Sequence, residues 1–524
     1  MNRRWRWLAA AVSGGLLYGA AMLEPWWWAA WLAPIPLLVA AFHTTGREAR
    51  WLAMTAGLIG AVATASYYAI VTGVAGTAII SALLALAWGF VVGTTRDVVV
   101  RWPRWPVVFL YPALWAGIDT VVAAVSPHGS DGTLVFSQVR ALPVLQIAAL
   151  IGAPGVIFLF SLFASAVAIA IFLGGRISQP GMAYGLASAA ILLALAFGAV
   201  RLSAPPDELA VPVGLAAIDQ GPAMETPEPQ AAAADAIWTE YGRAVASLAA
   251  RGAKLVALPE KIARLQTGEA SGLRARLAAM ARQSSVYLLA GVDVPAGEDF
   301  GSPRQPGQTL QGGSQTVPAP PAAPSQADGR AGSRENRAWF FSPRGELLAD
   351  YSKQHPVPGL EAAYRPGKTD MLRTLAGSRF GIVICKDLDY SGLPRRYARA
   401  GAAVLLQPAW DFDRDGWQRV GLAALRSVED GVTVVHSTRN GVLAVTDRYG
   451  RVTGAAASSS APVVTLLAPA PLGPGLATPY ARHGDWFGWL CVAGCTAAIA
   501  ASGLQRRGGR GGGDRARPRP PTDP

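Results

Sequence analysis

The chain has 524 residues and a formal net charge of +12, and 51% of its residues are hydrophobic. This length allows several domains, and the hydrophobic share is close enough to the globular average that composition alone does not separate a soluble chain from a membrane chain. Of the three cysteines only Cys385 lies in a polar part of the chain, which excludes a disulfide framework there.

Apolar residues are concentrated before residue 200 and after residue 485. Eight apolar runs are each near the length that spans a bilayer as a helix. They cover residues 8–23, 26–41, 51–71, 73–92, 107–125, 156–173, 183–200 and 486–504. We interpret the first run as a retained helix rather than a signal peptide, because six more follow it and no clean cleavage site ends it. The runs predict a membrane domain of about seven transmembrane helices over residues 1–205 and one further transmembrane helix over residues 484–505.

The arginines that flank these runs indicate how the chain crosses the membrane. They lie before the first run and between runs two and three, four and five, and six and seven, whereas the alternate connections carry almost none, Arg140 excepted. Because positively charged loops stay in the cytoplasm, residues 206–480 are expected outside and the basic tail, residues 506–524, inside. Membrane topology thus explains the positive charge, and we expect no nucleic-acid partner, although a Gly/Arg-rich tail can also bind RNA.

Between the two apolar parts, residues 206–480 alternate short β-rich runs with helical stretches. Strands are predicted over residues 211–218, 254–258, 286–292, 338–341, 380–384 and 403–407, and helices over residues 231–250 and 271–283. Such alternation is typical of an α/β layered domain, in which catalytic groups gather at strand ends. Residues 301–335 are rich in Pro, Gly, Ala, Gln and Ser without periodicity, and we predict a disordered insertion there.

Three reactive side chains stand at the ends of predicted strands: Glu260, Lys353 and Cys385. Each has an ordinary interpretation alone, because a lone thiol is often core, a loop acid is often solvated and a lysine is usually at the surface. Together the three residue types can carry out acyl transfer through a thiol. A partly buried carboxylate can take the proton of a thiol, and an ammonium group stabilises both a thiolate and the oxyanion of an acyl-transfer intermediate.

Other catalytic signatures are missing from the sequence. There is no G-x-S-x-G elbow, no H-E-x-x-H and no cysteine pair with zinc spacing, so we expect neither a metal nor another cofactor. Cys491 and Cys495 share one face of the last apolar run and are interpreted as packing residues. His355 or His436 could supply a Cys/His dyad, which we rank below the set of Glu260, Lys353 and Cys385.

The order of these three residues resembles that of the nitrilase (carbon-nitrogen hydrolase) superfamily, and the flanking membrane runs resemble the bacterial apolipoprotein N-acyltransferases. Seven short motifs carry the resemblance over nearly the full length: Gly132-Thr-Leu-Val-Phe-Ser-Gln138, Pro143-Val-Leu-Gln146, Gly152-Ala-Pro-Gly155, Lys353-Gln-His-Pro-Val-Pro358 with Glu361, Arg426-Ser-Val-Glu429, Thr438-Arg-Asn-Gly441 and Thr478-Pro-Tyr-Ala-Arg482. The chain departs from the family at Leu258, where tryptophan is usual, and at Lys386 and Asp387, where Tyr-Glu usually follows the cysteine.

The resemblance implies a multi-pass α-helical membrane protein with an extracytoplasmic αββα nitrilase-like sandwich. It implies a two-step acyl transfer in the bacterial cytoplasmic (inner) membrane, from a phospholipid to the N-terminal diacylglyceryl-cysteine of an apolipoprotein, by a protein that acts as a monomer. Cys385 would be the nucleophile, Glu260 the proton acceptor and Lys353 the oxyanion stabiliser, with Glu361 and Asp387 in support. The alternatives are a membrane-tethered amidase and a catalytically silent lipoprotein-binding scaffold.

Overall fold

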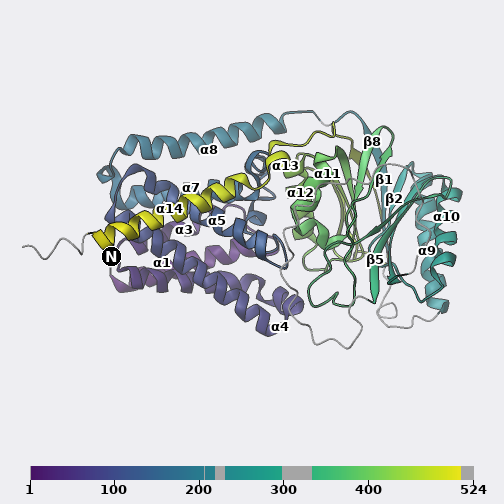
Figure 1. Ribbon diagram of the computed structural model, residues 1–524, viewed down its shortest axis with the longest axis horizontal. Helices are drawn as coiled ribbons and strands as arrows, with labels where there is room; N and C mark the ends of the chain where they lie inside the picture. Colours follow the sequence, from purple (N-terminus) through teal and green to yellow (C-terminus); the bar gives the residue numbers. More distant parts are fainter. Residues whose placement is uncertain (1, 206, 219–230, 298–332, 509–524) are drawn as a thin grey trace, which may run out of the picture.

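The computed structural model describes residues 2–205, 207–218, 231–297 and 333–508, and it shows a helical bundle beside an α/β domain (Figure 1). The predicted disordered insertion, residues 301–335, lies outside the described residues except for its last three, and strand β5 already begins at Arg334. The predicted basic tail, residues 506–524, lies outside them from residue 509 onward.

The bundle is built from α-helices whose sequences are mostly apolar. They are α1 (Arg3–Ala21), α2 (Ala29–Leu32), α3 (Pro34–Phe42), α4 (Gly46–Arg101), α5 (Leu110–Val125), α6 (Leu142–Leu145), α7 (Ala148–Leu173), α8 (Pro180–Leu202) and, from the other end of the chain, α14 (Trp486–Gly508). Within the described residues four helical segments are long and apolar enough to cross a membrane: Gly46–Arg101, Trp105–Val125, Ala148–Arg176 and Pro180–Leu202. The membrane character of this part is therefore confirmed, while the number of seven spans stays a prediction.

Helix α4 is a hairpin with two antiparallel arms. Gly73 has φ +72°, a left-handed conformation that glycine adopts without steric cost. The arms lie side by side, because Arg50 Nη2 is 2.9 Å from Asp97 Oδ2 and a Cβ on Gly57 would lie 2.8 Å from the ring of Trp88. The predicted runs 51–71 and 73–92 are the two arms, whereas the run 26–41 forms only the short helices α2 and α3.

The α/β domain contains two sheets. The first has the order β13-β1-β2-β4-β5-β6 with β3 paired to β4, and the second has the order β12-β11-β10-β9-β8-β7. The strands are β1 (Ala210–Ile218), β2 (Leu255–Ala257), β3 (Ala263–Arg264), β4 (Tyr287–Pro295), β5 (Arg334–Phe341), β6 (Leu347–Ser352), β7 (Leu372–Leu375), β8 (Ser378–Ile382), β9 (Ala402–Ala409), β10 (Thr433–Thr438), β11 (Val442–Thr446), β12 (Val452–Ala457) and β13 (Val463–Pro471). The helices are α9 (Ala231–Ala250), α10 (Ala270–Ser284), α11 (Gly392–Arg399), α12 (Gly416–Asp430) and α13 (Pro479–His483).

The two sheets pack face to face between two helical layers. Along β1, Leu215 belongs to the core between the sheets, whereas Ala216 packs under α9 and α10, as the two-residue alternation of a strand requires. On the other side, Leu393 of α11 and Leu422 of α12 share one apolar core with the membrane helices, including Ile157 of α7. The predicted αββα sandwich is confirmed, and its second helical layer is also the joint to the membrane domain (Figure 1).

Candidate active site

The structure brings the predicted residues Glu260, Lys353 and Cys385 to one place between the two sheets. Glu260 follows β2, Lys353 follows β6, and Cys385 follows β8. Lys353 Nζ lies 2.9 Å from Glu260 Oε1. The charge of Glu260 raises the pKa of the Cys385 thiol and the charge of Lys353 lowers it, so both groups lie within electrostatic range of the sulfur. The clustering expected from the strand ends is therefore present, and the chemical role of each residue stays a prediction.

Lys353 and Glu260 belong to a group of five side chains, of which four are buried and Lys261 is partly buried. Lys353 Nζ also lies 2.8 Å from Glu361 Oε2, and Asn336 Nδ2 donates to Glu260 Oε1 at 2.5 Å and to Glu361 Oε1 at 3.1 Å. Lys261 Nζ donates to Glu361 Oε1. Within the described part of the chain, Glu260 Oε2 is buried without a hydrogen-bond partner. We call Glu260, Lys261, Asn336, Lys353 and Glu361 the base cluster.

The charges of the base cluster balance one another. Burial lowers the pKa of Lys353, but the carboxylates of Glu260 and Glu361 outweigh it and raise that pKa well above its usual value. Burial raises the pKa of Glu361, but Lys353 and then Lys261 hold it far below its usual value. Glu361 thus remains a carboxylate between the ammonium groups of Lys353 and Lys261, and its supporting role stays a prediction.

Cys385 sits on a sharp turn directly after a buried strand. It opens the 3₁₀ helix η5 (Cys385–Asp389), here called the cysteine turn, with φ +43°, a conformation that is rare and strained for a residue other than glycine. Gln407 Nε2 donates to the carbonyl of Cys385 at 3.1 Å. Burial first, and the charge of Glu260 next, raise the pKa of the half-buried thiol, and Lys353 offsets only part of this rise. The raised pKa keeps this group a neutral thiol at neutral pH.

Asp387 ties the cysteine turn to the segment that carries Lys353. Its Oδ2 accepts hydrogen bonds from Tyr351 Oη at 2.7 Å and from the backbone of Ile384 at 3.0 Å. Its Oδ1 accepts from the backbone N–H groups of Gln354 at 3.0 Å and His355 at 2.8 Å. The predicted supporting residue thus fixes one segment against the other through hydrogen bonds rather than by pointing at the thiol.

Both histidines considered for a Cys/His dyad contact other side chains. His436 contacts Gln407 Oε1 through Nδ1 at 2.9 Å and Asp411 Oδ2 through Nε2 at 2.7 Å, so both of its ring nitrogens are occupied. His355 Nδ1 lies 2.9 Å from Asp387 Oδ1. These contacts do not support a Cys/His dyad. No group of three or more His, Cys, Asp or Glu side chains able to hold a metal ion occurs among the described residues.

The sequence interpretation did not single out Lys261 and Asn336. Lys261 follows Glu260 and has φ +50°, so this backbone turn directs two consecutive side chains into the base cluster. Asn336 lies in β5, between the predicted insertion, residues 301–335, and the predicted strand, residues 338–341. The position of Lys261 next to Glu260 was the available signal, whereas Asn336 had none.

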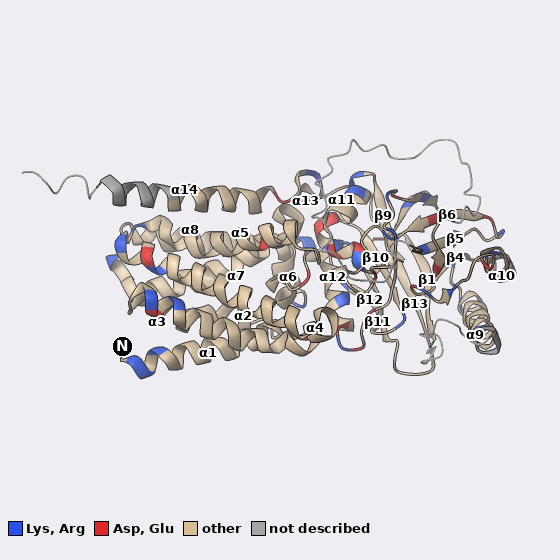
Figure 2. Ribbon diagram, turned by 60° about the horizontal axis from the view of Figure 1, so that its bottom comes forward, with Lys and Arg blue, Asp and Glu red and all other residues tan. Residues whose placement is uncertain are grey.

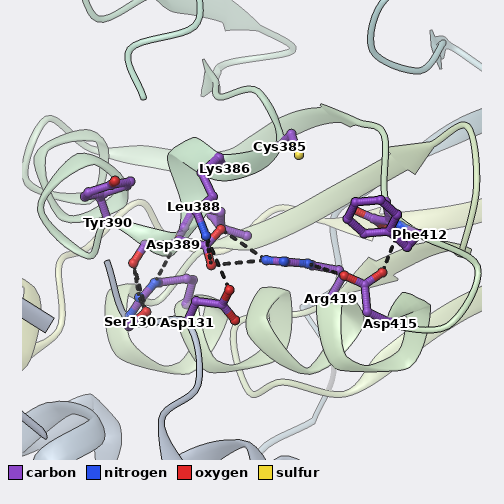
Figure 3. Close-up of polar contacts among 12 residues, drawn as sticks. Ser130, Asp131, Cys385, Lys386, Leu388, Asp389, Tyr390, Phe412, Asp415 and Arg419 are labelled. Atoms are coloured by element: carbon purple, nitrogen blue, oxygen red, sulfur yellow. Dashed lines mark hydrogen bonds and ion pairs between the residues drawn. The ribbon is translucent and has the colours of Figure 1, made fainter. Parts of the chain in front are cut away.

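Lys386, the departure from the family pattern beside the cysteine, points away from the thiol and toward the membrane domain (Figure 3). Its Nζ lies 3.5 Å from Asp131 Oδ2 and 3.5 Å from Asp389 Oδ1, so its charge is balanced on that side. Arg419 extends this contact between the two domains, because its guanidinium group lies against Asp389, Asp415 and Tyr67. We call Tyr67, Asp131, Lys386, Asp389, Asp415 and Arg419 the joint cluster.

Comparisons with known proteins agree with this architecture. The family model described as the apolipoprotein N-acyltransferase N-terminal domain matches residues 13–166, and that described as carbon-nitrogen hydrolase matches residues 215–467. A Geobacter metallireducens protein named apolipoprotein N-acyltransferase is 26% identical over 550 residues, which cover 96% of each chain. A Brucella melitensis protein of the same name is 28% identical over 193 residues, 32% of this chain and 36% of that one.

Among solved structures, an amidase of the nitrilase superfamily from Nesterenkonia AN1 is 18% identical, with a TM-score of 0.38 over 52% of this chain and 93% of the amidase. The two family models match consecutive parts of the chain, and the Geobacter relative spans both parts. The chain therefore belongs to the apolipoprotein N-acyltransferase family, whose catalytic domain is of the carbon-nitrogen hydrolase (nitrilase) type.

Proposed function

We propose that this bacterial membrane protein transfers a fatty acyl chain from a phospholipid to the N-terminal diacylglyceryl-cysteine of apolipoproteins. The observation that carries the proposal is the contact of 2.9 Å between Lys353 and Glu260 beside a strained Cys385, in a domain whose helical layer shares one core with membrane helices. Both substrates are lipids that stay in the bilayer, so a catalytic domain fixed to membrane helices meets them where they are.

The first step forms a thioester on Cys385. The free oxygen of Glu260, Oε2, takes the thiol proton as the sulfur attacks the ester carbonyl carbon of the phospholipid. The oxyanion that develops lies beside the Lys353 ammonium, which stabilises it in a site shielded from water. Collapse of this intermediate breaks the ester bond, and the departing lysophospholipid oxygen takes the proton from Glu260.

The second step passes the acyl chain to the lipoprotein. The α-amine of the diacylglyceryl-cysteine attacks the thioester carbonyl carbon, and Lys353 stabilises the new oxyanion. Glu260 takes a proton from the amine and returns it to the sulfur of Cys385 as the carbon-sulfur bond breaks. An amide and the neutral thiol result, so the enzyme is ready for another cycle.

The distribution of positive charge supports an extracytoplasmic position for the catalytic domain. Lysine and arginine side chains gather at the end of the helical bundle that lies far from the catalytic domain, near the N-terminus (Figure 2). Because positively charged ends of transmembrane helices stay in the cytoplasm, the catalytic domain is proposed to lie on the extracytoplasmic face of the inner membrane, in a protein that acts as a monomer.

The test uses the purified full-length protein and a phospholipid with a labelled acyl chain. The proposal expects a hydroxylamine-labile label on the protein that moves to a diacylglyceryl-cysteine peptide. The label should be absent in Cys385→Ala and present in Cys491→Ala, which removes a buried thiol of α14. Release of free fatty acid without the peptide would point to a hydrolase that uses water. The absence of any label would point to a binding scaffold.

A further inference from the structure

The residue that follows Cys385 is held by the membrane domain. Lys386 is buried, and its Nζ lies 3.5 Å from Asp131, which comes from residues 126–133 between α5 and the 3₁₀ helix η2 (Leu134–Gln138). The two partners are 255 residues apart in the chain. Burial raises the pKa of Asp131, but Lys386 and then Arg419 hold it below its usual value. Residues 126–133, here called the outer loop, thus place a carboxylate directly against the cysteine turn.

The backbone of the outer loop fits closely against the same turn. Ser130 donates to the carbonyl of Asp389 twice, from its backbone N–H at 3.0 Å and from Oγ at 2.8 Å. Tyr390 Oη donates to the carbonyl of Pro127 at 2.5 Å. A Cβ on Gly129, which has φ +63°, would lie 2.6 Å from the Asp389 carbonyl oxygen, so this approach requires glycine.

Arg419 extends the contact to the hairpin α4. Its Nη1 lies 3.1 Å from Asp389 Oδ1, its Nε 3.0 Å from Asp415 Oδ2, and its Nη2 donates to Tyr67 Oη at 2.9 Å. Tyr67 lies in the first arm of α4 and is buried. The outer loop therefore meets the end of the cysteine turn directly (Figure 3), and the first arm of α4 reaches it through Arg419.

We propose that the membrane domain positions the reacting thiol, with Asp131 of the outer loop acting through Lys386 as a positioning residue for Cys385. A residue held at φ +43° keeps that conformation only when its surroundings fix it. Asp387 and Gln407 fix the turn from the catalytic domain. From the membrane domain, Asp131 holds the side chain of Lys386, and Ser130 holds the carbonyl of Asp389 at the far end of the turn. The inference rests on the proposed function for its effect on rate.

The experiment compares full-length variants in two assays, the rate of thioester formation from labelled phospholipid and the alkylation of Cys385 by iodoacetamide, followed by mass spectrometry. In Asp131→Asn the kcat of thioester formation is expected to fall about tenfold or more with little change in KM, because small displacements of a reacting group are costly. Alkylation of Cys385 should become faster, because a loosened turn exposes a half-buried thiol. The matched control is Asp207→Asn, which removes a contact of 2.9 Å with Arg448 that does not touch the cysteine turn.

The pairing itself is tested by Lys386→Met and by the double variant Asp131→Asn with Lys386→Met. The double variant should lose no more activity than the worse single variant, because the two residues act as one unit. Ser130→Ala, which changes no charge, should move both rates in the same directions by a smaller factor and covers the case in which Asp131→Asn does not fold.

Rates in Asp131→Asn and Ser130→Ala that equal those of Asp207→Asn in both assays would overturn the inference and leave the proposed function intact. A wild-type protein that takes up no acyl group, but whose Cys385 is alkylated more slowly than in Asp131→Asn, would support positioning and refute the proposed function.

Discussion

Two groups of buried charges flank Cys385, and they differ in where their residues come from. The base cluster lies entirely within the catalytic domain, and Lys353 contacts both of its carboxylates at 2.8–2.9 Å. The joint cluster combines residues of both domains, and Lys386 lies 3.5 Å from Asp131 and 3.5 Å from Asp389. The base cluster leaves one carboxylate oxygen free to take a proton, whereas the joint cluster holds the turn that carries the thiol. One group is therefore suited to proton transfer and the other to positioning.

The largest effect should follow from Glu260→Gln, because an amide keeps the shape of the base and removes its ability to take the thiol proton. Thioester formation should fall about 10³-fold. Stopped incubations with labelled phospholipid measure the rate, and Glu269→Gln, which changes an exposed glutamate at the start of α10, serves as the control. A Glu260→Gln enzyme that forms the thioester at the wild-type rate would assign proton transfer to another group.

Lys353→Met should combine a large kinetic loss with a loss of stability. Removing the ammonium takes away the oxyanion partner, which should slow thioester formation about 10²-fold. It also leaves the carboxylates of Glu260 and Glu361 buried without it, which should lower the free energy of unfolding by about 3 kcal/mol. Denaturant titration and the acyl-transfer assay measure the two effects. A stable variant would mean that Lys261 alone balances the base cluster.

The variants Lys261→Met and Lys386→Met should distinguish the base cluster from the joint cluster by their effects on the pH dependence of the reaction. Lys261 donates to Glu361 and so helps to hold Lys353, and its loss should slow thioester formation about tenfold and move the pH dependence of the reaction. Lys386 is balanced by two acids on the side away from the thiol, so its loss should reduce the rate while the pH dependence stays in place. Equal shifts of the two pH profiles would show that the groups are not electrically separate.

The smallest effects concern the pH dependence of stability. The pKa of Glu361 is lowered by folding, so its contribution is present above the unfolded value of about 4.3 and is lost as the pH falls through the folded value. The pKa of Lys353 is raised by folding, so its contribution is complete below the unfolded value of about 10.4 and is lost as the pH rises through the folded value.

Thermal unfolding followed across pH should therefore show a plateau between about pH 5 and pH 10 with a decline on both sides. Lys353→Met should weaken the alkaline decline. Asp131→Asn should leave that decline unchanged and weaken only the acid one, because the pKa of Asp131 is lowered by folding. An alkaline decline that persists in Lys353→Met would assign it to other groups.

The strands that the sequence revealed most clearly are those with continuous apolar runs, such as β4 and β9, which are buried on both faces. Strand β12, by contrast, reads Val-Thr-Gly-Ala-Ala-Ala and was not predicted, because it is a partly exposed strand whose pairing with β11 compensates for a weak local pattern. The start of β5 was missed for a related reason. Asn336 and Glu335 are polar residues that are buried only because the fold supplies their partners.

The sequence by itself determined the division into apolar and polar parts, the α/β class of the polar part, and Glu260, Lys353 and Cys385 at strand ends. These features depend on local periodicity and on residue types at the ends of apolar runs. Only the tertiary structure decided that Lys261 and Asn336 complete the base cluster. It also decided that Lys386 turns away from the thiol and contacts Asp131, which is 255 residues away in the chain. Such contacts depend on how distant segments pack, and no pattern within a short stretch of chain encodes their partners.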